Sequence, residues 1–291
     1  MAAAAPLKLI VIAAQPSPRV RDGWRDLEPA VRAEERIKLV AVDDGGGLDF
    51  NRRKADLVVV LGGDGAILRA CRQMGSKQLP ILGVNLGRLG FLADLSPDEF
   101  RDNLPGIADR KFHVVEHLMY ECELTRSGKP TQRFLGLNEV AVSSAAAMRM
   151  IDVHLAVDDE AVTTYSGDGV IVSTPVGSTA HNLSAGGPIL RQDLQAFVIT
   201  PICPHTLTNR PLVDSADCVY TLSLPDIPEG TTLIIDGQIK QPLVSGDVIR
   251  IRRASVTFQL ARVPQHSYYG TLHRKLGWSG QPNYQRQDRR N

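Results

Sequence analysis

Short apolar runs recur along the amino-terminal part of the chain. They lie at residues 7–13, 37–42, 57–61 and 79–84, and each is apolar over most of its length instead of alternating with polar residues. Runs of this kind are typical of strands in a parallel sheet that is covered on both faces. Helical segments fit between them, so the pattern predicts a doubly wound, Rossmann-like α/β unit.

The pattern changes after Pro105. Apolar residues then recur at every second position, as at residues 151–157, 222–224 and 249–251, and turn residues separate these segments at short intervals. Such alternation predicts a mostly antiparallel, sandwich-like β region. We therefore expect an α/β domain over residues 1–105, a β-rich dinucleotide-binding domain over 106–265, and a carboxy-terminal segment over 266–291 that packs back on the first domain and ends in a disordered tail.

Composition narrows the classes of partner. The 291 residues carry 33 basic and 32 acidic side chains, a net charge of +1, so no overall field attracts nucleic acid or an anionic membrane. The four cysteines are far apart and form no CxxC pair, which fits reduced thiols in a cytoplasm. The first apolar run is too short to span a membrane. We expect a cytoplasmic protein that binds neither nucleic acid nor a membrane.

The turn Gly62-Gly63-Asp64-Gly65 joins the third apolar run to a segment compatible with a helix. A helix amino terminus at the carboxyl edge of a parallel sheet binds phosphate, and glycines let the ligand approach the backbone. The turn matches neither the P-loop nor the dinucleotide fingerprint. A carboxylate beside phosphates costs Coulomb energy unless a cation or an exchangeable proton lies between them. Asp64 therefore indicates Mg²⁺-bound phosphate or a hydroxyl to be activated, with a helix N-cap as the alternative role.

Three further segments are rich in polar and small residues. Residues 83–92 follow another buried strand and open onto the same sheet edge. Asn138-Glu139 interrupts an apolar strand, where an amide and a carboxylate could read ribose hydroxyls or base edges. Residues 168–188 combine hydroxyls, small residues and glycines, as a surface against a planar base and a sugar requires.

Together these motifs resemble one family, the NAD kinases. The matching segments fall in the family's order from about residue 57 to 278, and they are GGDG, NLGRLGFL, LNE, DGVIVSTPVGSTAHNLSAGGPI, ICPHTLTNRPLV, the turn at Asp236-Gly237-Gln238, and LHRKLGW. The GGDG turn alone would indicate only the wider superfamily of diacylglycerol, sphingosine and phosphofructo-kinases.

The resemblance implies a reaction and a set of site residues. NAD kinases transfer the γ-phosphoryl group of ATP, or in some members of polyphosphate, to the 2′-hydroxyl of the adenosine ribose of NAD, giving NADP. By this likeness Asp64 orients or deprotonates the hydroxyl, Gly65 gives phosphate access to the backbone, and Mg²⁺ carries the donor phosphates. The implied dinucleotide contacts are Asn138, Glu139, Arg149, Asp168, Thr179, Ala180, His181, Asn182, Leu183, Ser184 and Gln238. The likeness also implies a homodimer or homotetramer with sites shared between subunits.

The chain departs from the family pattern at three positions. Ala66 and Val176 stand where threonine is common, and His181 stands where tyrosine is common. Two rival functions therefore stay open: a lipid or sugar kinase of the same superfamily, and a catalytically silent NADP(H)-binding sensor. The HxxEH pattern at residues 113–117 is typical of a zinc helix, but its surroundings predict a strand, on which the two histidines lie too far apart for one metal.

Overall fold

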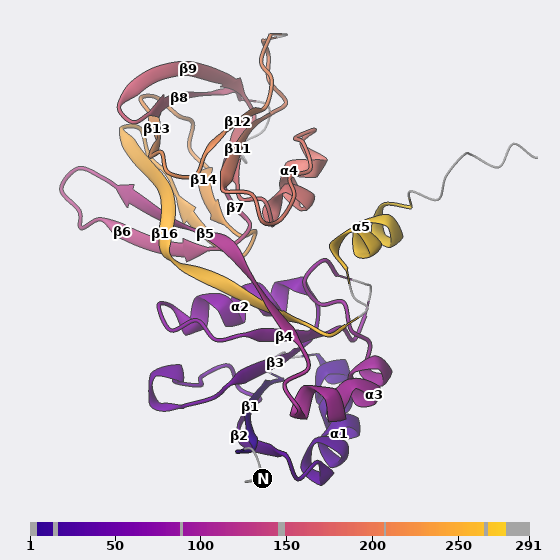
Figure 1. The fold of residues 1–291 in the computed structure, drawn as a ribbon. Coiled ribbons are helices and arrows are strands. Elements are labelled where there is room, and N and C mark those ends of the chain that lie inside the picture. The colour runs from indigo at the N-terminus through magenta and orange to yellow at the C-terminus, as the bar shows by residue number, and fades with distance from the viewer. Residues whose placement is uncertain are drawn as a thin grey trace, which may run out of the picture.

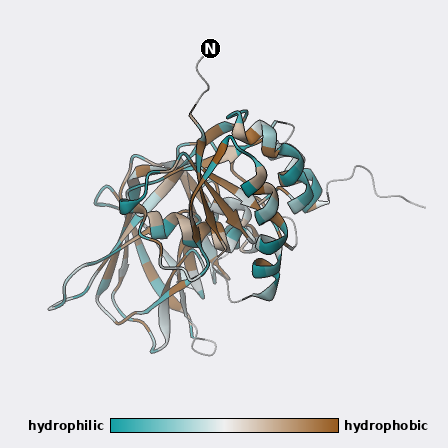
Figure 2. Cartoon of the chain, turned by 90° about the horizontal axis from the view of Figure 1, so that it is seen from below, coloured by the Kyte–Doolittle hydropathy of each residue, from teal (hydrophilic) through white to brown (hydrophobic). Residues whose placement is uncertain are grey.

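Two β-sheets organise the chain, and most of its helices lie around the first of them (Figure 1). The computed structural model describes residues 5–13, 17–87, 90–144, 149–206, 208–264 and 267–277. Within these residues the first sheet has ten strands and the second has six. Apolar strands lie inside and hydrophilic helix surfaces face outward (Figure 2).

The amino-terminal strands form the parallel part of the first sheet, in the order β2-β1-β3-β4. Their bounds are Leu7–Ile12 for β1, Ile37–Asp43 for β2, Leu57–Leu61 for β3 and Ile81–Val84 for β4. Three helices accompany them: α1 (Pro18–Ala33), α2 (Asp64–Met74) and α3 (Pro97–Ala108). Alternate residues of β1 enter different apolar clusters, one containing residues of α1 and α3 and the other residues of α2. The predicted doubly wound α/β unit is confirmed.

Two long strands carry this sheet into the rest of the chain. β16 (Asp247–Arg262) pairs in parallel with β4 through Leu260 and Ile81, and β5 (His113–Thr125) pairs antiparallel with β16 along most of its length. The other antiparallel strands of this sheet are β6 (Gln132–Gly136), β8 (Ile151–Val157), β9 (Glu160–Gly167) and β13 (Tyr220–Leu224). The HxxEH residues lie on β5, which confirms the predicted strand.

The second sheet is antiparallel throughout, in the order β12-β11-β10-β7-β14-β15. Its strands are β7 (Glu139–Ser144), β10 (Gly169–Ser173), β11 (Ala196–Ile202), β12 (Leu212–Ser215), β14 (Thr231–Ile235) and β15 (Ile239–Pro242). One apolar cluster joins Tyr120 and Cys122 of the first sheet to Val142 and Phe197 of the second. The predicted sandwich-like β region is therefore confirmed.

The carboxy-terminal helix α5 (Tyr268–Leu276) lies beside the first sheet (Figure 1). Its Lys275 ammonium sits 4.5 Å from the centre of the Phe91 ring, a cation–π contact. Trp278 and the tail predicted to be disordered fall outside the described residues. The domain boundaries at residues 105 and 265 stay predictions. In the described part of the chain, none of the helices has the length and apolar content to cross a membrane.

Candidate active site

The GGDG turn leads from β3 directly into α2. Gly62 has a φ of 136°, which favours glycine, and its N–H donates to Val84 O at 2.9 Å. Gly63 caps the helix with an extended backbone, and Asp64 is the first helical residue. Asp64 is therefore not the N-cap, which removes the alternative role considered for it. A Cβ at Gly63 would meet no protein atom within 4 Å, so a ligand can approach the backbone there.

The Asp64 carboxylate is bound by a backbone loop from the second predicted motif. It accepts N–H groups from Phe91 at 2.8 Å, Leu92 at 3.0 Å and Ala93 at 3.0 Å. Gly90 lies so close that a Cβ on it would overlap the carboxylate. The GGDG turn and residues 91–93 are thus in contact, at the sheet edge that the motif at residues 83–92 was expected to share with the turn.

Asp236 organises the Leu137-Asn138-Glu139 segment. Its buried carboxylate accepts the backbone N–H groups of all three residues, the shortest at 2.8 Å from Asn138. The Tyr120 hydroxyl also donates to it, at 2.9 Å. Five donors around one carboxylate, counting Arg72, fix the backbone of the LNE motif.

Arg72 connects α2 to the turn between β14 and β15. Its guanidinium bonds Asp236 at 3.0 Å and also Gln238. The Gln238 amide in turn donates to Gly65 O at 2.9 Å. Asp236 and Gly237 both have positive φ, and Gln238 N–H donates to Ile235 O, so the pair forms a type I′ turn, for which Asp-Gly is a favoured sequence. The predicted residues Gly65 and Gln238 are therefore in contact.

Glu139 is a buried acid that is partly unpaired. Its side chain is 4% exposed, and Oε2 has no hydrogen-bond partner among the described residues. Burial, and secondly the charge of Asp236, raise the pKa of Glu139 to about 8, against a hydrogen bond from the His181 backbone. Glu139 can therefore carry a proton near neutral pH and donate it to a ligand oxygen.

Residues 174–188 lie directly against the LNE segment. Thr174 N–H donates to Asn138 O at 2.9 Å, and a Cβ at Gly177 would overlap that carbonyl. The segment forms a 3₁₀ turn at Gly177–Thr179 and the short helix α4 at His181–Ser184. His181 and Ser184 are exposed, Ala180 and Leu183 are half-buried, and Thr179 is buried.

Asn182 is turned into the protein. Its amide nitrogen donates to Ser178 O and Pro188 O, both at 3.0 Å, and its oxygen accepts from the Thr200 hydroxyl at 2.6 Å. Both donor positions of the amide are thus used within the chain. Asn182 therefore stabilises this loop from inside, while its neighbours His181 and Ser184 lie on the surface.

Two of the three departures from the family pattern are core residues. Ala66 and Val176 are 5% and 3% exposed and belong to the apolar cluster that contains α2. A side chain at either position packs inside the fold. Among the three departures only His181 is exposed.

Arg149 and Asp168 lie apart from this cluster. Glu139 pairs with Ser173 at one end of β10, whereas Asp168 precedes Gly169 at the other end. At about 3.4 Å per residue, the stretch from Ser173 to Gly169 spans roughly 14 Å. Within one chain the predicted site residues therefore form two groups, and Arg149, exposed just before β8, stands outside the first group.

The residues that sequence reasoning missed are those that position the others. In the sequence Asp236 is recognisable only as part of a turn, and neither Arg72 nor the amides of residues 91–93 stand out. Asp-Gly between two apolar strands was the available signal, since it predicts a tight hairpin. That the Asp236 side chain would reach Asn138 could not be read from the sequence.

Comparisons with known proteins identify the family of this chain. The family model for the ATP-NAD kinase N-terminal domain matches residues 33–112, and the model for the C-terminal domain matches residues 137–263. An NAD kinase of Rhodopirellula baltica is 47% identical over 94% of this chain and 88% of its own length. An NAD kinase of Geotalea daltonii is 44% identical over 77% of this chain and 79% of its own.

Solved structures share the fold. An NAD kinase from Archaeoglobus fulgidus in complex with ATP has a TM-score of 0.68 at 28% identity, covering 93% of this chain and 98% of its own. Yeast NADH kinase complexed with NADH has a TM-score of 0.86 over 96% of this chain and 90% of its own, at 23% identity. From the paired family models and the bacterial relatives, the chain belongs to the NAD kinase family.

Proposed function

We propose that this chain phosphorylates the 2′-hydroxyl of the adenosine ribose of NAD, with ATP or polyphosphate as donor, to make NADP. The observation that carries the proposal is the placement of Asp64 at the first turn of α2, where the backbone of residues 91–93 binds its carboxylate. The next residue, Gly65, is joined to the LNE segment through Gln238 and Asp236.

Asp64 acts as the base or orienting group. A carboxylate has about four lone-pair positions, and three of them accept the N–H groups of Phe91, Leu92 and Ala93. The remaining position, on the oxygen that accepts only from Phe91, can take the proton of the attacking hydroxyl. Phosphoryl transfer depends mainly on positioning and charge stabilisation, so one fixed carboxylate suffices.

The donor phosphates approach the amino terminus of α2. The open space at Gly63 exposes the backbone, and the helix dipole favours an anion there. The described residues contain no group of three or more His, Cys, Asp or Glu that could hold a metal ion. No protein cage for Mg²⁺ is therefore assigned, and Mg²⁺ enters the proposal as the companion of the ATP phosphates, which it prefers as ligands.

The dinucleotide lies along the LNE segment and residues 179–184. Glu139 follows Asn138 in the chain and is bonded by the backbone of the exposed His181, and the unpaired Glu139 Oε2 supplies a partner for a ribose hydroxyl. Asp168 and Arg149 act from a second copy of the chain, because they lie at the far end of β10 from Glu139. The proposal therefore includes a homodimer or homotetramer, in the cytoplasm that the cysteine pattern suggests.

The experiment that tests the proposal measures NADP formation by the purified chain with NAD, Mg²⁺ and either ATP or polyphosphate. We expect Mg²⁺-dependent product, and we expect Asp64→Asn to lower turnover at least about a hundredfold while NAD still binds. A lipid or sugar kinase would form no NADP and would consume ATP only when its own lipid or sugar acceptor is added. A silent sensor would bind NADP(H) and form no product.

A further inference from the structure

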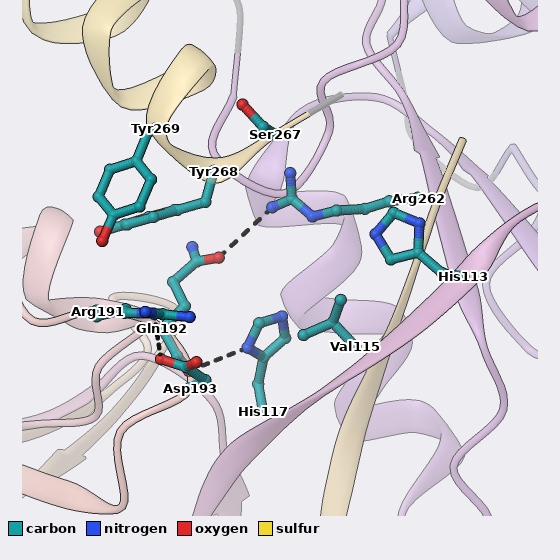
Figure 3. Close-up of a pocket in the computed structure, with 10 residues that line it drawn as sticks. All are labelled: His113, Val115, His117, Arg191, Gln192, Asp193, Arg262, Ser267, Tyr268 and Tyr269. Carbon is teal, nitrogen blue, oxygen red and sulfur yellow. Dashed lines mark hydrogen bonds and ion pairs between the residues drawn. The ribbon is translucent and has the colours of Figure 1, made fainter. Parts of the chain in front are cut away.

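A cavity lies outside the site described above. It has a volume of about 310 Å³ and lies between β5, the end of β16, residues 191–193 and the start of α5 (Figure 3). This volume is at the lower end of the range for small-molecule sites. We call it the His117–Gln192 cavity after the two side chains that distinguish it.

His117 and Gln192 are buried polar residues whose hydrogen bonding is incomplete. His117 is 2% exposed and Gln192 is 5% exposed. His117 Nδ1 lies 3.1 Å from Gln192 O. A carbonyl oxygen only accepts, so Nδ1 carries the proton and Nε2 is left as an acceptor. His117 Nε2 has no hydrogen-bond partner in the described part of the chain.

The Gln192 amide supplies the complementary group. Its Oε1 accepts from Arg262 at 3.4 Å, which assigns the oxygen and leaves Nε2 as a donor. That nitrogen has no partner within the described ranges either, and Figure 3 shows it directed toward the tyrosines of α5. Because buried polar atoms in proteins nearly always have a partner, an unpaired donor and an unpaired acceptor on two residues that line one cavity indicate a ligand with both functions.

The charges around the cavity favour an uncharged ligand. Arg191 is paired with Asp193 at 2.8 Å, and Arg262 is paired with Asp94 at 3.2 Å. Burial lowers the pKa of His117, and Arg262 adds to this, so the ring is neutral near neutral pH. Each lining arginine therefore already has its own counter-charge.

The shape of the cavity favours a flat ligand. Tyr268 and Tyr269 of α5 present their rings on one side, and Val115 lies on the opposite side (Figure 3). We propose that the His117–Gln192 cavity is a second small-molecule site, which takes an uncharged planar ring that carries a carboxamide with at least one N–H. The carboxamide oxygen accepts from Gln192 Nε2, its N–H donates to His117 Nε2, and the ring packs against the tyrosines.

The cavity has a direct structural connection to Asp64. Arg262 in its wall holds Asp94, and Asp94 follows the residues 91–93 whose amides hold the Asp64 carboxylate. The helix that supplies the tyrosines also places Lys275 over Phe91. An occupied cavity is therefore expected to change turnover without competing with NAD. Unchanged turnover at saturating ligand would show that the cavity is not coupled to Asp64. The binding site itself is tested separately, by titration.

Calorimetric titration of the full chain tests the site. The probes are benzamide and nicotinamide, and the controls are N,N-dimethylbenzamide, which lacks the N–H, and nicotinic acid, which is charged. We expect the two probes to bind at least about tenfold more tightly than the controls. Saturating NADP should leave this binding unchanged. Displacement by NADP, or no preference for the probes, would overturn the proposal.

Matched variants locate the binding. Gln192→Leu and His117→Phe should each weaken benzamide binding about tenfold or more, whereas Gln195→Leu, on an exposed residue of the same loop, should not. In the wild-type chain, ¹⁵N NMR of the His117 ring should show Nε2 accepting a hydrogen bond when benzamide is added. This measurement decides the question even if a variant fails to fold, because an unchanged Nε2 signal at saturation contradicts the site.

Discussion

At the scale of single residues, two glycines of one turn have different roles. Gly62 needs its positive φ, whereas Gly63 has an extended backbone and open space where a side chain would point. Gly63→Ala should therefore leave the melting temperature within a few degrees of wild type and raise the KM for ATP about tenfold or more, because the methyl group occupies the phosphate approach.

Gly47→Ala serves as the control for this prediction. A Cβ added at Gly47 also meets nothing within 4 Å, and Gly47 lies outside the turn, in the loop that follows β2. Equal donor KM values for the two alanine variants would show that the α2 terminus does not contact the donor.

Glu139 gives the second prediction at this scale. Its pKa is about 8 in the folded chain and near the ordinary glutamate value of 4.5 in the unfolded chain, so between these pH values the unfolded chain releases a proton that the folded chain retains. Its contribution to stability is fully present below about pH 4.5 and is lost as pH rises toward 8. Glu139→Gln cannot ionise, so its melting temperature relative to wild type should rise between pH 5 and pH 8.

Thermal unfolding of both proteins at several pH values measures this difference. A melting-temperature difference that does not change with pH would mean that Glu139 ionises normally in the fold.

At the scale of elements, the loop residues 90–93 allow a direct test of how Asp64 is held. A Cβ at Gly90 would overlap the Asp64 carboxylate, so Gly90→Ala should displace that carboxylate from the amides of residues 91–93. We expect turnover to fall about a hundredfold while NAD binding changes little. Gly87→Ala is the control. A Cβ added at Gly87 would lie 3.9 Å from its nearest neighbour, Asn85 Oδ1, which is an ordinary van der Waals distance.

Steady-state kinetics and NAD titration of the two variants separate the effects. If Gly87→Ala lost as much turnover as Gly90→Ala, the loss would come from the loop as a whole and not from the position of Asp64.

Elements were more predictable than the contacts between them. The parallel strands could be predicted because burial on both faces makes a sequence such as Leu57–Leu61 continuously apolar. The phosphate-binding turn followed from its glycines and its place at the sheet edge. The Asp236 contacts could not be predicted, because they join residues about a hundred positions apart and depend on how the two sheets pack. Likewise, a polar residue in a glycine-rich loop, such as Asn182, gives no sequence sign of whether it faces ligand or core.

At the scale of the whole molecule, the separation of the predicted site residues yields a complementation test. If Asp168 acts from a neighbouring copy, Asp64→Asn and Asp168→Asn chains, each nearly inactive alone, should regain activity when assembled together. A mixed dimer has one site with both aspartates and one with neither, so half of its sites recover. Co-expression with two affinity tags isolates the mixed assembly for assay, and no recovery would place both aspartates in one chain's site.

The paired strands β5 and β16 also determine how substrates can enter. They run from the edge of β4 into the β region, and their pairing extends from Arg262–His113 to Val248–Thr125, with one register shift between Arg253 and Thr257. A movement of the two sheets away from each other would have to bend these two strands or break the hydrogen bonds between them. The segments at residues 90–93 and 174–188, which bond Asp64 and Asn138, lie outside these two strands. We expect substrate exchange to depend on motion of these segments and not on reorientation of the two sheets.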